Sequence, residues 1–234
     1  MSLAVFGSIA SAQGILIDDF STDQNLLFVN PTSGGFVDGS VQGDGLGGGE
    51  RDVSISGSGF ADGDQAEFKA QDGVGTFRSW ESSGRSGAHT GGVAFTSLFY
   101  RSFADGSVDF PDLSNSSARF DLSNLDRIVI DVVDVVGSVS LTAFIGTEDS
   151  SGSTGFVRHA RLDVDGPGTI ELSLADFNPL FGAAPDLSRA FDISFDFEVD
   201  VNESLALGSI RAVPTPGAAS VFAIGAVVGS RRRR

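Results

Sequence analysis

The sequence predicts an all-β protein in which two antiparallel sheets pack as a β-sandwich of the jelly-roll type. Three observations support this fold class. Apolar and polar residues alternate with a period of two along most of the chain, clusters of Gly, Ser and Asp separate the alternating segments, and no segment shows a convincing amphipathic-helix pattern. Such a succession of short strands and polar turns is typical of a single sandwich domain, here residues 13–212.

The alternation assigns the strands in chain order. It is clearest in 191–201, where Phe, Ile and Val alternate with Asp, Glu and Ser. Segment 128–136 is apolar at nearly every position, which indicates a central strand covered on both faces. Residues 175–180 fit a single helical turn. The expected strands are 15–20, 51–56, 65–70, 92–100, 118–123, 128–136, 139–145, 156–164, 170–174, 191–201 and 205–213.

The composition limits the chemistry and the partners. The chain has no cysteine, so neither a disulfide nor a cysteine-ligated metal site can form. It carries 15 Lys and Arg residues against 31 Asp and Glu residues, a net charge of −16, and Lys69 is its one lysine. Such a surface repels nucleic acid and anionic lipid, so nucleic acid is excluded as a partner and a secreted protein is favoured.

The first residues fit a leader sequence. Residues 1–12 are small and apolar and end in Ala10-Ser11-Ala12, which predicts a signal peptide cleaved after Ala12. No Lys or Arg precedes the apolar part, so the signal peptide is expected to be truncated. The alternative is that this segment is the first β-strand.

The last residues, 213–234, differ from the rest of the chain. Pro214 and Pro216 fix the backbone around Thr215 in an extended conformation, and Gly217 adds a flexible joint. A proline-rich segment of this kind stays accessible to another protein.

An uncharged apolar run, 218–230, follows and ends at four arginines, 231–234. As a helix it is short for a hydrocarbon core of ~30 Å, so insertion requires a thinned bilayer or arginine stems that reach back to the headgroups. We expect a short apolar helix that inserts transiently, with the arginines on the cytoplasmic side. The alternative is a buried hairpin or helix that precedes a basic tail.

The Pro-x-Pro-Gly motif, the apolar run and the arginine cluster resemble the PEP-CTERM sorting signal of exported bacterial envelope proteins. Thr215 stands where the commonest form of that motif has Glu. The resemblance implies recognition by an exosortase-type membrane protease, removal of the apolar tail, and release or attachment at the cell surface. The residues that carry it are Val213, Pro214, Thr215, Pro216, Gly217, Arg231, Arg232, Arg233 and Arg234.

The body of the chain resembles the jelly-roll, galactose-binding-like modules of secreted bacterial proteins. The segments that carry this resemblance are 17–20, 48–52 and 207–213. It implies that the N- and C-terminal strands lie side by side, with the tail at one edge, and that a structural Ca²⁺ binds near them. Asp18 and Asp19 are the expected ligands, and no other cofactor is expected. The alternative is that both form a hydrogen-bonded strand start.

No catalytic set stands out. His89 and His159 lie in no recognisable nucleophile context, and both are expected to be solvated. Carboxylates are too abundant for any one pair to be informative. Asp131 and Asp134 interrupt an otherwise apolar strand, and we interpret them as residues of a strand edge or bulge.

One segment fits a sugar site. Glycan binding commonly uses a flat aromatic side chain surrounded by hydrogen-bonding groups, and Trp80 lies between Arg78 and Glu81. The alternative is that Trp80 is a partly buried core residue. Most of the 20 Phe residues alternate with polar ones and are assigned to the core.

These observations predict an exported, non-catalytic protein of the cell envelope, cell surface or extracellular matrix of a double-membraned bacterium, with a sandwich that binds glycan. Its expected partners are an exosortase-type protease and an extracellular polysaccharide. One alternative is a secreted, carboxylate-dependent glycan-active enzyme, which two inward acids about 5–10 Å apart in a groove would favour. Another is a structural surface-layer subunit that self-associates.

Overall fold

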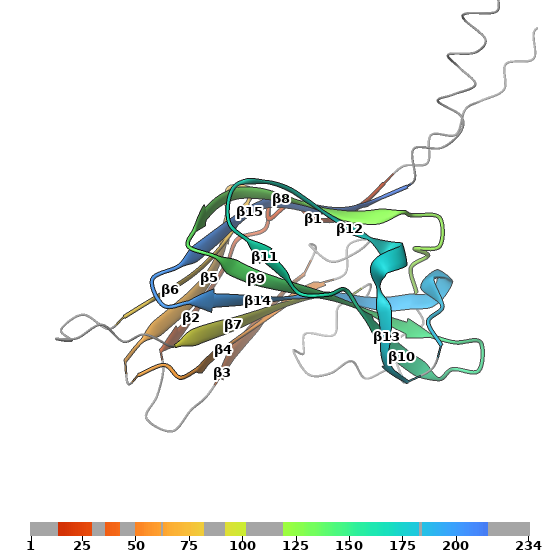
Figure 1. Ribbon diagram of the computed structural model, residues 1–234, viewed down its shortest axis with the longest axis horizontal. Helices are drawn as coiled ribbons and strands as arrows, with labels where there is room; N and C mark the ends of the chain where they lie inside the picture. The colour runs from red at the N-terminus through yellow and green to blue at the C-terminus, as the bar shows by residue number, and fades with distance from the viewer. Residues whose placement is uncertain are drawn as a thin grey trace, which may run out of the picture.

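The computed structural model describes the chain in seven segments, and it confirms the expected sandwich. Apart from two 3₁₀ turns, the ordered elements in this part of the chain are antiparallel strands, which form two packed sheets in a jelly roll. Figure 1 shows the two layers. The described residues are 14–29, 36–42, 50–61, 63–81, 92–101, 119–182 and 184–214.

The smaller sheet holds both terminal strands. Strand β1 pairs with the C-terminal half of β15. In sheet order the path is β12 (Gly168–Ser173), β8 (Arg127–Val136), β15 (Ser204–Val213), β6 (Val74–Trp80), β5 (Gln65–Gln71) and β2 (Gln24–Val29), with β1 (Ile15–Asp18) beside β15.

The larger sheet has β14 near its centre. Strand β11 pairs with β9 next to β10. In sheet order the strands are β13 (Asn178–Gly182), β10 (Thr154–Arg158), β9 (Val139–Glu148), β14 (Ala190–Asp200), β7 (Val93–Arg101), β4 (Glu50–Ser58) and β3 (Phe36–Gln42), with β11 (Leu162–Val164) beside β9.

The core lies between the sheets and follows from the period-two alternation. On β14 the residues Phe195 and Phe197 are buried, whereas the intervening Asp196 faces outward. The Phe197 ring packs 4.6 Å from that of Phe77 on β6, which packs 5.0 Å from Phe68 on β5, so the aromatic contacts join the two layers. Each such buried side chain stabilises the fold by about 1.5–3 kcal/mol.

The terminal strands lie side by side, as expected. Ile15 pairs with Ala212 in an antiparallel register, and β1 and β15 run together at the upper right of Figure 1. However, β15 lies between β8 and β6, inside the sheet. Val213 therefore ends an interior strand, which has β8 on one side and β1 on the other at this end.

Two expected strands differ from the observed ones. Residues 156–164 form β10 and β11 with a break at 159–161. Five residues from Arg158 to Leu162 oppose four on β9, which is a bulge. Segment 118–123 contributes one isolated bridge, between Phe120 and Ala190.

Strand β8 is covered on both faces in its first half, where 128–130 are buried. The expectation fails in its second half, because Val133 and Val136 are each 52% exposed.

Four strands, β2, β3, β6 and β13, were not expected from the pattern. Strand β6 contains Gly75, where a Cβ atom would lie 2.5 Å from the Phe20 ring, so the strand has a glycine at a fully packed position. The turn expected at 175–180 is a 3₁₀ turn at Leu174–Asp176 that leads into β13.

Within the described residues, no helix is both long and apolar enough to cross a bilayer. Residues 1–12 and 215–234 lie outside the described residues, and so do the expected leader and the expected apolar helix.

Candidate functional site

The outer face of the larger sheet combines polar and aromatic side chains. On β7 the inward residues Ala94, Leu98 and Tyr100 are buried in the core, and the residues between them point outward. On β9 the inward Leu141 and Ala143 are likewise buried, so the residues next to them in the strand point outward. The strand registers place these outward side chains in rows that run across the strands.

A central row on this face is entirely polar. It crosses five adjacent strands, with each residue paired to the next, and it consists of hydroxyl and carboxylate side chains. We call it the polar row: Asp38 on β3, Ser54 on β4, Ser97 on β7, Asp196 on β14 and Thr142 on β9.

Phenylalanines stand on both sides of the polar row. Phe99 and Phe144 belong to the row on one side, where both pair with Ser194. Phe36 and Phe95 belong to the row on the other side, where both pair with Ser56. Phe36 is 69% exposed, and the other three are partly buried. We call these four residues the phenylalanine borders.

Asp196 is the perturbed carboxylate of the polar row. Burial raises its pKa, and the negative charge of Glu198 acts in the same direction, while a hydrogen bond with Ser97 opposes them. Glu198 itself forms an ion pair with Arg161, whose Nη1 lies 2.7 Å from Oε2 of Glu198. Arg161 also donates to Oγ of Ser140 at 2.6 Å. Asp196 thus accepts a hydrogen bond from the Ser97 hydroxyl, while Glu198 is paired with Arg161.

The Trp80 segment lies on the opposite side of the molecule, on the outer face of the smaller sheet. Trp80 is partly buried, and Cζ of Arg78 lies 4.9 Å from the centroid of its ring. Arg78 also forms an ion pair with Glu67 at 2.5 Å. The structure thus brings Arg78 and Trp80 together, and Glu81 follows directly. A sugar site at Trp80 stays a prediction. Arg78 packs against the Trp80 ring.

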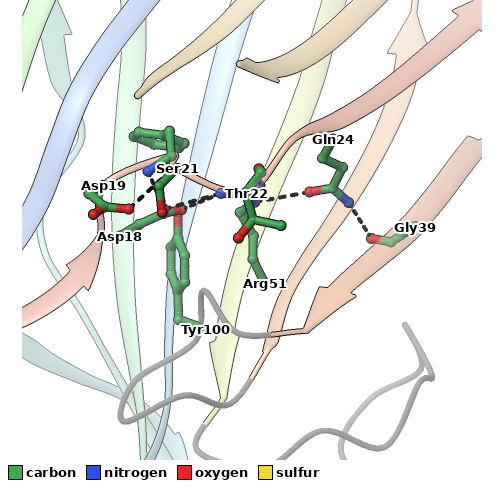
Figure 2. A network of polar contacts seen from close by, with 9 residues as sticks. Asp18, Asp19, Ser21, Thr22, Gln24, Gly39, Arg51 and Tyr100 are labelled. Carbon is green, nitrogen blue, oxygen red and sulfur yellow. Dashed lines mark hydrogen bonds and ion pairs between the residues drawn. The ribbon is translucent and has the colours of Figure 1, made fainter. Parts of the chain in front are cut away.

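Asp18 and Asp19 have separate partners (Figure 2). Oδ2 of Asp18 accepts from Nη1 of Arg51 at 2.9 Å and from the Tyr100 hydroxyl at 2.7 Å. Burial raises the pKa of Asp18, while the charge of Arg51 opposes this shift. Asp19 is exposed and accepts from the amide N–H of Ser21 at 3.0 Å, and hydrogen bonds from Ser21 lower its pKa. Both carboxylates are thus hydrogen-bonded, but they lie at the end of β1 and not at a strand start.

The described residues around this pair do not form a metal cage. Among the residues that the structure describes, no three His, Asp or Glu side chains gather closely enough to hold a metal ion. Calcium binding at Asp18 and Asp19 stays a prediction that the geometry does not support.

The Asp18–Arg51 pair belongs to a larger buried network. Nε of Arg51 donates to Oε1 of Gln24 at 2.9 Å, its Nη2 donates to the Thr22 carbonyl at 2.8 Å, and Nε2 of Gln24 donates to the Gly39 carbonyl at 3.1 Å. The side chains of Asp18 and Arg51 are both 0% exposed. The pair is closed off from solvent, and the network connects strands of both sheets.

The other acidic and imidazole candidates are structural. Nη1 of Arg211 lies 2.5 Å from Oδ2 of Asp131, and its hydrogen bond, with that of Ser209, lowers the pKa of Asp131. Asp134 pairs with Ala206 beside a bulge, as interpreted from the sequence. His159 is 9% exposed and packs edge-on against a phenylalanine, so the expectation of a solvated side chain is wrong. His89 lies outside the described residues.

Of the sorting motif, Val213 and Pro214 are described. Val213 ends β15, and its carbonyl accepts from the amide N–H of Asp126 at 2.8 Å. The rest of the motif, Thr215–Gly217 and Arg231–Arg234, lies outside the described residues.

Sequence reasoning missed the phenylalanine borders because it assigned most Phe residues to the core. A signal was present in the order of the residues. Phe95 and Phe99 are separated from Ser97 by one residue each, so all three side chains share one face of the strand. Leu98 lies on the opposite face. Phe144 shares its face with Thr142 in the same way.

Comparisons with known proteins give distant matches only. No protein-family model and no curated protein sequence matches the chain. Among solved structures, a family 11 carbohydrate-binding module from Clostridium thermocellum, in complex with a β-1,3-1,4-mixed-linked tetrasaccharide, is 15% identical over 88% of this chain and 98% of that one, with a TM-score of 0.41. The solution structure of a carbohydrate-binding module, CtCBM11, is 16% identical over 89% and 100%, with a TM-score of 0.43.

An exo-β-agarase is also similar, at 15% identity over 88% of this chain and 25% of that chain, with a TM-score of 0.36. A likeness at these values carries no inference about ligand or activity.

Proposed function

We propose that the sandwich is a non-catalytic glycan-binding domain and that the glycan lies along the polar row. The observation that carries this proposal is a row of hydroxyl and carboxylate side chains with phenylalanines on both sides. A sugar ring offers hydroxyls at its rim and C–H groups on its faces. Ser97, Thr142 and Asp196 supply hydrogen-bonding partners for the hydroxyls, and aromatic side chains supply apolar contact area.

The dimensions suit a chain of sugars. The polar row crosses from β3 to β9, four strand spacings of ~4.8 Å each, which amounts to roughly 19 Å. Several sugar rings fit that length. A linear glycan would therefore lie across the strands and contact β3, β4, β7, β14 and β9.

The proposal includes export and sorting. Residues 1–12 resemble a leader, and 213–234 resemble the sorting signal, which together support an envelope or extracellular protein processed by an exosortase-type protease. In the structure the described fold continues to Val213, at the start of that signal. The folded body and the sorting signal are thus contiguous in the chain.

Affinity electrophoresis tests the glycan proposal. Gels cast with mixed-linkage β-glucan, xyloglucan or agarose are expected to retard the wild-type protein in at least one case. Phe99→Ala is expected to lose that retardation because it removes a border of the polar row, whereas Trp80→Ala, on the other sheet, is expected to keep it. If Trp80→Ala loses retardation and Phe99→Ala keeps it, the site belongs at Trp80.

One observation favours a glycan-active enzyme as a second candidate. Asp196, with a raised pKa, lies two residues from Glu198 on β14, a separation of about 7 Å along the strand. Glycosidases use two carboxyl groups at such a spacing, one of them with a raised pKa. Release of reducing ends from the retarding glycan, abolished in Asp196→Asn, would establish that activity and overturn the non-catalytic assignment.

A further inference from the structure

We infer that the polar row selects neutral, polyhydroxylated glycans against polyuronates and that Asp196 is the residue that sets this selectivity. The inference rests on the proposed function and names the ligand class for the same site. It is carried by the distribution of charge on the outer face of the larger sheet and by the partners of Asp196.

Negative side chains lie in two neighbouring rows of this face. The registers turn carboxylates outward in the polar row and in the row that contains Phe95. Those of the described residues are Asp38, Asp163, Asp196 and Glu198. A polyanion laid along the row would approach these groups within a Debye length of about 8–10 Å, where like charges are not screened. A neutral glycan meets no such repulsion.

The cations described near the face do not reverse this charge. Arg161 is paired with Glu198 at 2.7 Å. Arg158 lies on β10, beyond the Thr142 end of the polar row, and pairs in register with Phe144. A uronate carboxylate in the middle of the row would therefore face Asp196 and Asp38 without a cation directed at it from the described part of the row.

A divalent cation could otherwise bridge acidic protein groups to an acidic glycan. The described residues hold no cluster of three or more His, Asp or Glu side chains able to bind a metal ion. In the part of the chain that the structure describes, this route to a polyuronate has no support.

Asp196 is distinguished from the other carboxylates by its surroundings. It is partly buried in the row, between Ser97 and Thr142. Within the described residues its hydrogen bond is with Ser97, and no cation pairs with it. Glu198 has Arg161, and Asp163 accepts from Ser140 at 2.9 Å. A partly buried carboxylate without a cation gains most from donors. Sugar hydroxyls supply donors in charge-assisted hydrogen bonds, and carboxylates do not.

The test compares three full-length proteins: wild type, Asp196→Asn, and Asp134→Asn as the matched control. Asp134 is an exposed residue on the smaller sheet, so its substitution makes the same change in net charge away from the row. Retardation is measured in gels with mixed-linkage β-glucan, xyloglucan and agarose as neutral probes and with polygalacturonate and alginate as polyuronates, all in EDTA. Near-UV circular dichroism verifies folding, and Asp38→Asn, on edge strand β3, serves as a second row variant.

We expect a neutral probe, and neither polyuronate, to retard the wild type. Asp196→Asn should bind that neutral probe roughly 10- to 100-fold more weakly, as for a lost hydrogen bond to a charged group, and should gain retardation by a polyuronate. Asp134→Asn should behave as wild type.

Wild-type retardation by a polyuronate as strong as that by any neutral probe overturns the inference and leaves the proposed function intact. An unchanged Asp196→Asn removes the assignment to Asp196, and retardation of the wild type by no probe overturns the proposed function.

Discussion

Asp18 and Arg51 form an ion pair that is closed off from solvent between the sheets (Figure 2). Asp18 comes from β1 of the smaller sheet, Arg51 from β4 of the larger sheet, and Tyr100 from β7, so the contacts of one carboxylate join both layers. The guanidinium carbon also lies 5.5 Å and 5.6 Å from the ring centroids of Phe20 and Phe68. Desolvation of both charges is offset only because every group of the pair has a close partner.

Substitution of one member of this pair is expected to destabilise the fold strongly. Asp18→Asn leaves the Arg51 charge buried without its counterion, which should lower the free energy of unfolding by about 3–5 kcal/mol. The exposed neighbour offers a matched control, since Asp19→Asn weakens one surface hydrogen bond and should lower it by less than about 1 kcal/mol. Urea unfolding curves measure both.

Equal effects of the two substitutions would show that the buried pair does not hold the sheets together.

The same curves recorded with calcium and with EGTA test the calcium prediction: a wild-type midpoint that rises with calcium, and does not rise in Asp19→Asn, would support it.

At the scale of the elements, strict alternation made a strand predictable. Strand β14 alternates Phe and Val with Asp and Glu, so both its existence and its inward face follow from the sequence. Strand β7 has apolar residues on both faces, and the pattern located the strand without identifying Phe95 and Phe99 as outward residues.

Three of the four strands that were not expected, β3, β6 and β13, contain Gly or Pro, which normally argue against a strand. Strand β13 contains Pro179 and ends at Gly182, whose φ of +87° is a left-handed conformation. A Cβ at Gly182 would lie 2.4 Å from the Thr154 carbonyl, so close contact between the two backbones requires glycine there. This packing reason is visible only once β10 and β13 are paired.

The candidate site could not be predicted because it depends on sheet order. The polar row takes one residue from each of β3, β4, β7, β14 and β9, and their order in the sheet differs from their order in the chain. Alternation gives the face of each side chain but no register between distant strands. For the same reason Asp18 was singled out, whereas its partner Arg51, thirty-three positions along the chain, was not.

At the scale of the whole molecule, the fold places both ends of the described chain together. Strand β1 begins beside the end of β15, so the proposed leader and the proposed sorting signal both adjoin the same end of the sandwich (Figure 1). Val213 is held in the sheet, and its carbonyl accepts from the amide N–H of Asp126, so we expect processing to leave the sandwich intact.

Intact-mass spectrometry of the protein recovered from the growth medium tests the sorting proposal. We expect a product that begins after Ala12 and ends near residue 217, because the resemblance implies removal of the apolar run and the arginines. A secreted product that still carries Arg231–Arg234 would contradict processing and would leave the glycan proposal unaffected.

The most direct test of the account is amide chemical-shift mapping of the protein titrated with an oligosaccharide of the neutral glycan that retards it most. We predict that the perturbed amides cluster on the central strands of the larger sheet, at Ser54, Ser97, Thr142 and Asp196 and at the phenylalanine borders. Perturbations centred on Trp80 and Arg78 of the smaller sheet, or none at saturating oligosaccharide, would contradict it.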